Sequence, residues 1–166
     1  MSNTDFEARG VCVTGGARGL GAALSRRFAQ AGAHVYVGDI LDEQGLALVA
    51  ELLAEGMSAS FHHLDVASET DWMALTAAIL RYGDKLDVLV NNAGRITRKS
   101  LAATSLEEWN SAMAVNVAGV FLGMKHCQPL LARRAPSAIV NISSTAGLIA
   151  HGDPSYTASK WAVRGL

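Results

Sequence analysis

The chain carries, at residues 11–21, the stretch Val11-Cys12-Val13-Thr14-Gly15-Gly16-Ala17-Arg18-Gly19-Leu20-Gly21. Its first four residues form a short apolar run, which is typical of a buried strand. Apolar residues then recur at helical spacing as far as Ala31, and Gly32 ends the predicted helix. Such a glycine-rich turn lets the backbone approach a pyrophosphate, which the helix N-terminus would bind. The alternative is a turn that only packs the helix against the strand.

The same alternation continues along the rest of the chain. Further strands are predicted at residues 34–37, 58–64, 86–90 and 138–142. Helices are predicted at residues 42–55, 68–82 and 105–134, the last either unbroken or with a break, and from Pro154 onward. Each strand reads as a continuous apolar run, as expected when helices cover both faces of a sheet. The sequence therefore predicts one α/β domain over residues 1–166, with a doubly wound, Rossmann-like parallel sheet in the order 3-2-1-4-5.

Helical spacing also predicts which side chains of two helices face the core. For the helix at 42–55 they are Leu46, Val49, Leu52 and Leu53. For the helix at 68–82 they are Trp72, Leu75, Ile79 and Tyr82. Ser105 and Glu108 form a capping box, which predicts where the helix at 105–134 begins.

Polar residues gather where the predicted strands end. They are the glycine-rich turn, Asp39, Asp65, the segment Asn91-Asn92-Ala93-Gly94 and the pair Ser143-Ser144. Because the carboxyl ends of parallel strands meet at one edge of a sheet, we expect these residues to line a single rim. Open α/β sheets bind their ligands at that rim, so it is the predicted binding site.

The two charged residues nearest the predicted ligand favour opposite forms of the cofactor, without and with a 2′-phosphate. Asp39 ends the second strand, where a carboxylate accepts hydrogen bonds from an adenosine ribose and repels a 2′-phosphate. Arg18 would attract a 2′-phosphate or would simply remain solvated. The alternative for Asp39 is an acidic turn residue before the next helix. Because the carboxylate would stand directly at the ribose, the sequence favours NAD over its phosphorylated form.

Three further polar positions allow two interpretations each. Asp65 would bind an adenine amino group, or it would cap the turn before the next helix. The segment 91–94 is a plain turn, since Asn and Gly are turn formers, or an asparagine there ties neighbouring strands together. Asn116 lies in an apolar helical stretch, so its amide needs a buried partner such as a water molecule or the backbone.

A second candidate site lies in the stretch Tyr156-Thr157-Ala158-Ser159-Lys160. Asp153 and Pro154 are typical of an N-cap followed by proline at the first helical position. Residues four apart share a helix face, so the tyrosine and the lysine would point into the same space. A phenol is a weak base at neutral pH, and a nearby cation favours its phenolate form. One lysine is not expected to suffice, and an oxidised nicotinamide ring would add a second positive charge. The alternative is a surface tyrosine packed on a lysine stem.

Composition narrows the classes of function. Half of the 166 residues are hydrophobic, the net charge is −1, and no basic run indicates nucleic acid or an anionic membrane surface. Cys12 and Cys127 lie far apart and the five histidines form no ligand pattern, so no metal site is predicted. Residues 1–9 are polar, without the apolar core of a signal peptide, and no apolar run reaches membrane-spanning length. A cytoplasmic location is expected.

Together, these motifs resemble those of the short-chain dehydrogenase/reductase family. The matching elements are T-G-G-A-R-G-L-G at 14–21, Asp39, D-V at 65–66, N-N-A-G at 91–94, the Asn116 helix, N-I-S-S-T-A-G at 141–147 and Y-T-A-S-K at 156–160. They cover nearly the whole chain in the family's order. Three segments, G-D-I-L-D-E-Q-G, G-V-F-L-G-M-K and S-K-W-A-V-R-G-L, are most similar to bacterial NAD-dependent 3α(20β)-hydroxysteroid dehydrogenases.

The resemblance implies an NAD(H)-dependent oxidoreductase that interconverts a secondary alcohol and a ketone. It implies that Tyr156 is the general acid/base, that Lys160 assists it and binds the nicotinamide ribose, and that Asn116 holds a water linked to the lysine. The serine that polarises the substrate oxygen is taken as Ser144, which keeps the S-S-x-A-G register, whereas the usual spacing to the tyrosine matches Ser143. The residues implied in NAD binding are Gly15, Ala17, Arg18, Gly19, Leu20, Gly21, Asp39, Ile40, Asp65, Val66, Asn92, Ala93, Gly94, Tyr156 and Lys160.

The chain departs from the family pattern after Lys160, because it ends at Leu166. Family members continue with further strands and a substrate loop, so we expect a sheet without its last strands and with an unprotected edge. A homo-oligomer, a tetramer in the family, is expected for a full-length form. Two other functions stay open. One is a non-catalytic cofactor-binding fragment, and the other is a reductase of 3-oxoacyl or sugar substrates on the same scaffold.

Overall fold

The computed structural model describes residues 5–83 and 86–166; residues 1–4, part of the polar N-terminal segment noted above, lie outside it. The strands are β1 (Gly10–Thr14), β2 (His34–Asp39), β3 (Ser58–His63), β4 (Val88–Asn91) and β5 (Ala138–Asn141). The helices are α1 (Gly19–Gln30), α2 (Asp42–Ala54), α3 (Glu69–Arg81), α4 (Leu106–Met113), α5 (Gly119–Ala132) and α6 (Pro154–Val163). Three short helical segments lie between them: η1 (Leu101–Ala103), η2 (Ala114–Ala118) and η3 (Thr145–Gly147).

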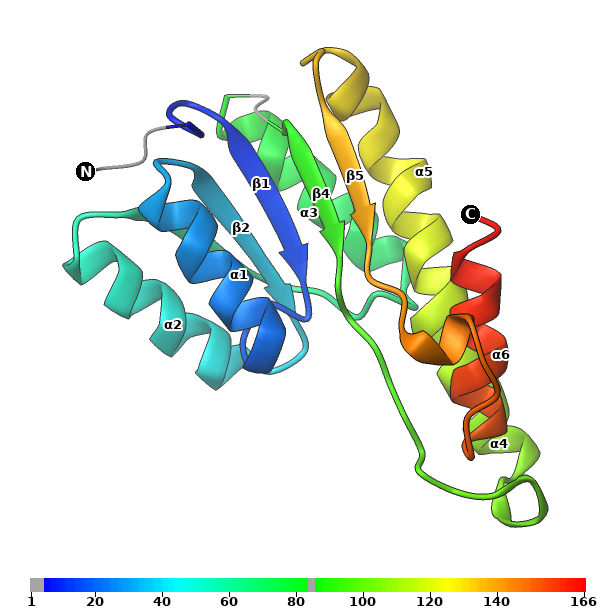
Figure 1. The fold of residues 1–166 in the computed structure, drawn as a ribbon. Helices are drawn as coiled ribbons and strands as arrows, with labels where there is room; N and C mark the ends of the chain where they lie inside the picture. Colours follow the sequence, from blue (N-terminus) through cyan, green and yellow to red (C-terminus); the bar gives the residue numbers. More distant parts are fainter. Residues whose placement is uncertain (1–4, 84–85) are drawn as a thin grey trace.

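The strands form one parallel sheet in the order β3-β2-β1-β4-β5 (Figure 1). The register places Val13 of β1 opposite Val37 of β2, and Val90 of β4 opposite Val140 of β5. The predicted fold class and strand order are therefore confirmed. The order reverses between β1 and β4, and the carboxyl ends of these two strands mark the place where such sheets bind ligands.

Helices cover both faces of the sheet, and successive side chains of each inner strand point to opposite faces and pack against different helices. On one face, Val11 and Val13 belong to a buried cluster with Leu48 and Leu52 of α2. On the other face, the cluster joins Cys12 to Trp72 of α3 and to apolar residues of α5. Figure 1 shows α1 and α2 together on one side of the sheet, with α3 and α5 on the other.

The predicted apolar faces of α2 and α3 were partly wrong. Leu46 and Leu53 of α2 are 58% and 53% exposed, and Tyr82 after α3 is 66% exposed. The buried stripe of α2 is Gly45, Leu48, Val49 and Leu52. Gly45 sets this stripe, because a Cβ on it would lie 2.1 Å from the Phe61 ring of β3. The close approach of α2 to the sheet turns the helix so that Leu46 and Leu53 fall beside the stripe.

The expectation that every strand is apolar and covered on both faces fails at the two edges of the sheet. β3 has the sequence S-A-S-F-H-H and is only partly buried. β5 is mostly exposed, with Ile139 at 37% and Val140 at 44%. Only β1, β2 and β4 lie between two strands, so they alone match the pattern of a fully covered parallel sheet. The expected open edge at β5 is observed.

The long helical stretch contains a break of a specific kind. The capping box of Ser105 and Glu108 begins α4, as predicted. Between α4 and α5 the backbone widens into a π-helical turn, η2, which contains Asn116. Such turns occur frequently at functional sites. Among the described residues, no helix combines the length and the apolar character needed to span a membrane.

Candidate active site

In the glycine-rich loop between β1 and α1, Gly15, Gly19 and Gly21 have different structural roles. Gly15 has φ of +60°, and a Cβ on it would lie 2.9 Å from the Ala93 Cα. A Cβ on Gly21 would lie 1.9 Å from the Gly15 carbonyl oxygen, so α1 packs directly on the loop. Gly19 has φ of +54° and faces open space. No side chain caps the first turn of α1, which leaves its N–H groups available to an anion.

Asp39 joins the end of β2 to this loop. Its Oδ2 accepts a hydrogen bond from the Ala17 N–H at 2.9 Å, and its Oδ1 accepts one from the Leu41 N–H at 3.1 Å. The residue is 7% exposed and lines the cavity above the loop. Because each carboxylate oxygen accepts two hydrogen bonds, both retain capacity for a ligand hydroxyl. Asp39 therefore serves the turn, and its position also suits ribose binding.

The asparagines at the end of β4 tie three strands together. The Asn92 side-chain amide donates to the carbonyl oxygens of Thr14 and Gly15 at 2.9 and 3.1 Å. The Asn91 amide donates to the Asn141 oxygen of β5 at 2.9 Å. The interpretation of 91–94 as a tie between strands, rather than a plain turn, is therefore confirmed. These bonds hold the rim of the sheet in one arrangement.

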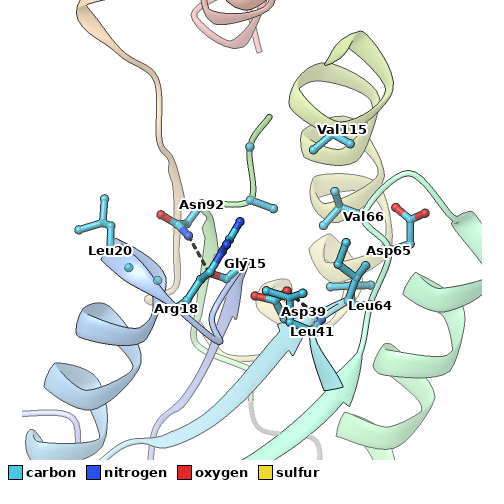
Figure 2. Close-up of a pocket in the computed structure, with 15 residues that line it drawn as sticks. Gly15, Arg18, Leu20, Asp39, Leu41, Leu64, Asp65, Val66, Asn92 and Val115 are labelled. Carbon is cyan, nitrogen blue, oxygen red and sulfur yellow. Dashed lines mark hydrogen bonds between the residues drawn. The ribbon is translucent and has the colours of Figure 1, made fainter. Parts of the chain in front are cut away.

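Most of the residues predicted to bind the cofactor line one cavity at this rim (Figure 2). Three of them, Ala17, Tyr156 and Lys160, are not part of the cavity lining. Asp65 lines it, although its Oδ1 also accepts the Ala67 N–H at 2.9 Å, so both interpretations of Asp65 keep support. The predicted residues in the lining are Gly15, Arg18, Gly19, Leu20, Gly21, Asp39, Ile40, Asp65, Val66, Asn92, Ala93 and Gly94. Leu41, Leu64 and Val115 line it as well.

Sequence reasoning missed these three apolar residues. Leu41 and Leu64 each adjoin a polar strand end that was noticed, so their position beside Asp39 and Asp65 was a usable signal. Val115 reaches the cavity from η2, and a π-turn leaves no clear mark in the sequence.

Tyr156 and Lys160 share one face of α6, as predicted. The Lys160 Nζ lies 5.6 Å from the centre of the Tyr156 ring and donates to the Ile142 carbonyl oxygen at 2.7 Å. Lys160 is 4% exposed, and burial lowers the pKa of its ammonium group. A Cβ on Gly94 would lie 3.8 Å from this Nζ. Because Gly94 also lines the cavity, the lysine connects the cavity to the tyrosine.

Asn116 holds α6 against the loop that follows β4. Its Oδ1 accepts the Arg95 N–H at 2.7 Å, and its amide donates to the Arg95 carbonyl at 2.8 Å and to the Ser159 hydroxyl at 2.9 Å. The side chain is fully buried. Of the two partners expected from the sequence, a water molecule or the backbone, the structure shows the backbone, at Arg95. The water-holding role implied for Asn116 stays a prediction.

The two serines after β5 have different partners. The Ser143 hydroxyl donates to the Lys160 carbonyl at 3.0 Å. It also packs against Gly147, where an added Cβ would lie 2.7 Å from the Ser143 Oγ. The Ser144 Oγ accepts the Ala146 N–H at 3.2 Å, so its own proton remains available to donate. The bond of Ser143 to the helix backbone favours Ser144 as the serine that would face a substrate.

Asp153 is more than the predicted N-cap of α6. Its carboxylate accepts hydrogen bonds from the Tyr156 N–H and the Ser155 hydroxyl, and from Thr97 and Arg98 in the loop after β4. Burial alone would raise the pKa of this carboxyl, but the hydrogen bonds outweigh burial and lower the pKa well below its usual range. The sequence offered no signal for the loop contacts, which join residues 55 and 56 positions apart.

Comparison with known proteins agrees with this geometry. A model of the short chain dehydrogenases matches residues 9–166. Cyclopentanol dehydrogenase of Comamonas sp. is 44% identical over 93% of this chain and 62% of its own length. Trans-4-hydroxycyclohexanecarboxylate dehydrogenase of Sinomonas cyclohexanicum is 41% identical over 93% of this chain and 62% of its own. The 3-alpha-(or 20-beta)-hydroxysteroid dehydrogenase of Mycobacterium bovis is 43% identical over 93% of this chain and 58% of its own.

The chain spans about three fifths of the length of these relatives. The matched part includes the glycine-rich loop, the strand-end residues and the Tyr156 helix, all within residues 9–166. The chain belongs to the short-chain dehydrogenase family.

Proposed function

We propose that the chain forms the cofactor-binding and proton-transferring part of an NAD-dependent oxidoreductase that interconverts a secondary alcohol and a ketone. The observation that supports this most strongly is the contact between two sites. Gly94 lines the cavity at the rim, and the same glycine lies against Lys160, four residues from Tyr156. A ligand in the cavity would extend toward the tyrosine.

The residues of the cavity fit a dinucleotide. Gly19 leaves open space over the uncapped N-terminus of α1, which suits a pyrophosphate. Asp39 has lone pairs for ribose hydroxyls, and its charge would oppose a 2′-phosphate more directly than exposed Arg18 would attract one. Exposed Ile40 offers an apolar surface for an adenine ring. When bound, the oxidised cofactor would accept a hydride from the alcohol carbon, and the reduced cofactor would supply a hydride to the ketone.

The chain's own residues would move the proton. Tyr156 takes the alcohol proton as a phenolate and gives it back to the ketone oxygen in the reverse direction. The buried Lys160 ammonium lies 5.6 Å from the centre of the tyrosine ring and so places a positive charge beside it. Ser144 donates a hydrogen bond to the substrate oxygen, and Asn116 keeps α6 aligned through Ser159. The protein would thereby take the one proton that the alcohol must lose on oxidation to the ketone.

Cyclic secondary alcohols are the proposed substrates, because the relatives are named for cyclopentanol, a hydroxycyclohexanecarboxylate and hydroxysteroids. The alternative is a fragment that binds cofactor without turnover. The single-domain organisation, the homo-oligomer and the cytoplasmic location expected from the sequence stay predictions.

Oxidation of cyclopentanol with NAD, followed by NADH absorbance, separates these functions. We expect turnover by the chain and a loss of about 10³-fold or more in Tyr156→Phe, since general acid–base catalysis contributes roughly 10²–10⁴-fold. Equal NADH fluorescence titrations in both proteins would show that the variant still binds cofactor. Cofactor binding without turnover in the unmodified chain would contradict the catalytic function and support the binding fragment.

A further inference from the structure

A second cavity lies beside α6 and is separate from the proposed cofactor site. It measures about 360 Å³, and its walls come from residues 96–100, after β4, and residues 151–153, before α6. The rings of His151 and Tyr156 stand edge to face, with centroids 6.1 Å apart. His151 lines the cavity and contacts Tyr156, so the cavity adjoins the tyrosine, which is not itself in the lining.

Asp153 holds both walls of this cavity. Its Oδ2 accepts hydrogen bonds from the Thr97 N–H, the Thr97 hydroxyl and the Arg98 N–H, each at 2.7 Å. Its Oδ1 accepts the Ser155 hydroxyl at 2.7 Å and the Tyr156 N–H at 2.9 Å. A carboxylate offers about four lone-pair sites, so five donors leave it no capacity as an acceptor for a ligand. The walls are thereby fixed relative to the catalytic helix.

Arg98 is held in a backbone conformation that costs free energy. Its φ is +57°, in the left-handed region, which is unfavourable for a residue other than glycine. The bond from its N–H to Asp153 keeps it there, and its exposed side chain lines the cavity. Strain of this kind persists where the surrounding structure maintains it, often at ligand sites.

His151 is also held on three sides. Its N–H donates to the Thr157 Oγ1 at 3.2 Å, and its carbonyl accepts from the same hydroxyl at 3.2 Å. Its ring Nδ1 accepts the Asp153 N–H at 3.3 Å. A neutral imidazole with an accepting Nδ1 carries its proton on Nε2, so the other ring nitrogen is a donor.

We propose that this cavity binds a carboxylate on the substrate, so that the substrate is a cyclic alcohol or ketone with a carboxylate away from the reacting carbon. This inference rests on the proposed function and names its substrate class. Arg98, Lys99 and His151 present donors to the cavity, and Ile96 adds an apolar wall. Guanidinium groups bind carboxylates through paired, charge-assisted hydrogen bonds.

Two acidic groups near the cavity oppose an anion less than their charge suggests. Asp153 is enclosed by its five donors. Glu108 pairs with Lys99 at 2.5 Å, which leaves Arg98 as the main cation. The Arg98 guanidinium therefore carries most of the predicted recognition.

A matched pair of ketones tests the inference without requiring turnover. Calorimetry measures the binding of 4-oxocyclohexanecarboxylate and of 4-oxocyclohexanecarboxamide to the full chain, with saturating NADH and without cofactor. The two ketones differ mainly in charge. We expect the carboxylate to bind about tenfold tighter or more, since a hydrogen bond to a charged group contributes roughly 1.5–3 kcal/mol.

Arg98→Gly removes the guanidinium while suiting the left-handed backbone, so this variant is expected to fold. It should bring the carboxylate down to the affinity of the amide, whereas Arg98→Lys should keep part of the preference. Arg27→Ala, which removes an exposed arginine of α1, should change neither affinity. Equal affinities for the two ketones, or a preference that survives Arg98→Gly, would overturn the inference.

Cofactor binding is followed by NADH fluorescence in the same samples. Samples that bind NADH but show no preference for the carboxylate contradict this inference alone. Samples that bind no NADH contradict the proposed function, and the titration without cofactor then decides whether the carboxylate site exists.

Discussion

Helix α2 packs against β2 and β3, whereas α6 packs against α4, η2 and η3, and different forces hold the two helices. The contact of α2 with the sheet is apolar, through Leu48, Val49 and Leu52. The buried residues of α6 include Ser155, Ser159 and Lys160, and all three donate hydrogen bonds. Hydrogen bonds therefore contribute more to holding α6 in place than they do for α2.

This difference has a physical consequence. Apolar burial is non-directional and depends on area, so it fixes a layer without fixing the angle of each side chain. Hydrogen bonds are directional and lose much of their strength when bent, so they orient Tyr156 and Lys160 more strictly. A helix held by a carboxylate also depends on the charge of that group. The two helices should consequently respond to different changes.

Asp153→Ala should separate the two regions most strongly. It removes the acceptor of five hydrogen bonds and leaves buried donors unpaired, which we expect to cost about 3–5 kcal/mol of unfolding free energy. Hydrogen exchange should show protection lost over α6 and the loop after β4, with β1 still protected. The same loss of protection in β1 and in α6 would contradict a separate polar anchor.

A leucine pair tests the apolar side of the comparison. Leu52→Ala leaves a cavity in the core and should cost about 3 kcal/mol, whereas Leu53→Ala should cost about 0.5 kcal/mol or less. Denaturant unfolding measures both values, and the pair is matched in residue type and helix. Similar losses for the two variants would mean that the buried stripe of α2 is assigned wrongly.

The smallest expected effect is the response of α6 to acid. The pKa of Asp153 is lowered on folding, so its stabilisation is fully present above the unfolded pKa of about 4 and is lost as pH falls toward the folded value. Unfolding free energies of the wild type and Asp153→Asn should therefore differ most near neutral pH and converge below about pH 4. A difference that stays constant from pH 7 to pH 2 would show that the charge of Asp153 is unimportant.

Much of this arrangement could be predicted from local sequence signals. The glycine turn after Thr14, the strand-end polar residues and the i, i+4 spacing of Tyr156 and Lys160 each reflect local geometry. The errors came from packing at a distance. Leu46 and Leu53 were misplaced because Gly45 brings α2 close to Phe61 of another element.

The role of Asp153 shows a second limit of the sequence. Its N-cap position can be recognised from the local sequence, but its bonds to Thr97 and Arg98 depend on how the loop after β4 meets the start of α6. The π-turn around Asn116 similarly reflects tertiary contacts with Arg95 and Ser159. Long-range polar contacts of this kind involve isolated residues that form no periodic pattern in the sequence.

We propose that the rim of this chain binds NAD through the glycine loop and Asp39. Separate fluorescence titrations of the chain with NADH and NADPH test it most directly. We expect NADH to bind about tenfold tighter or more, because a buried carboxylate beside the ribose opposes the 2′-phosphate. Asp39→Asn should narrow that ratio. Tighter binding of NADPH, or no binding of either cofactor, would contradict the claim.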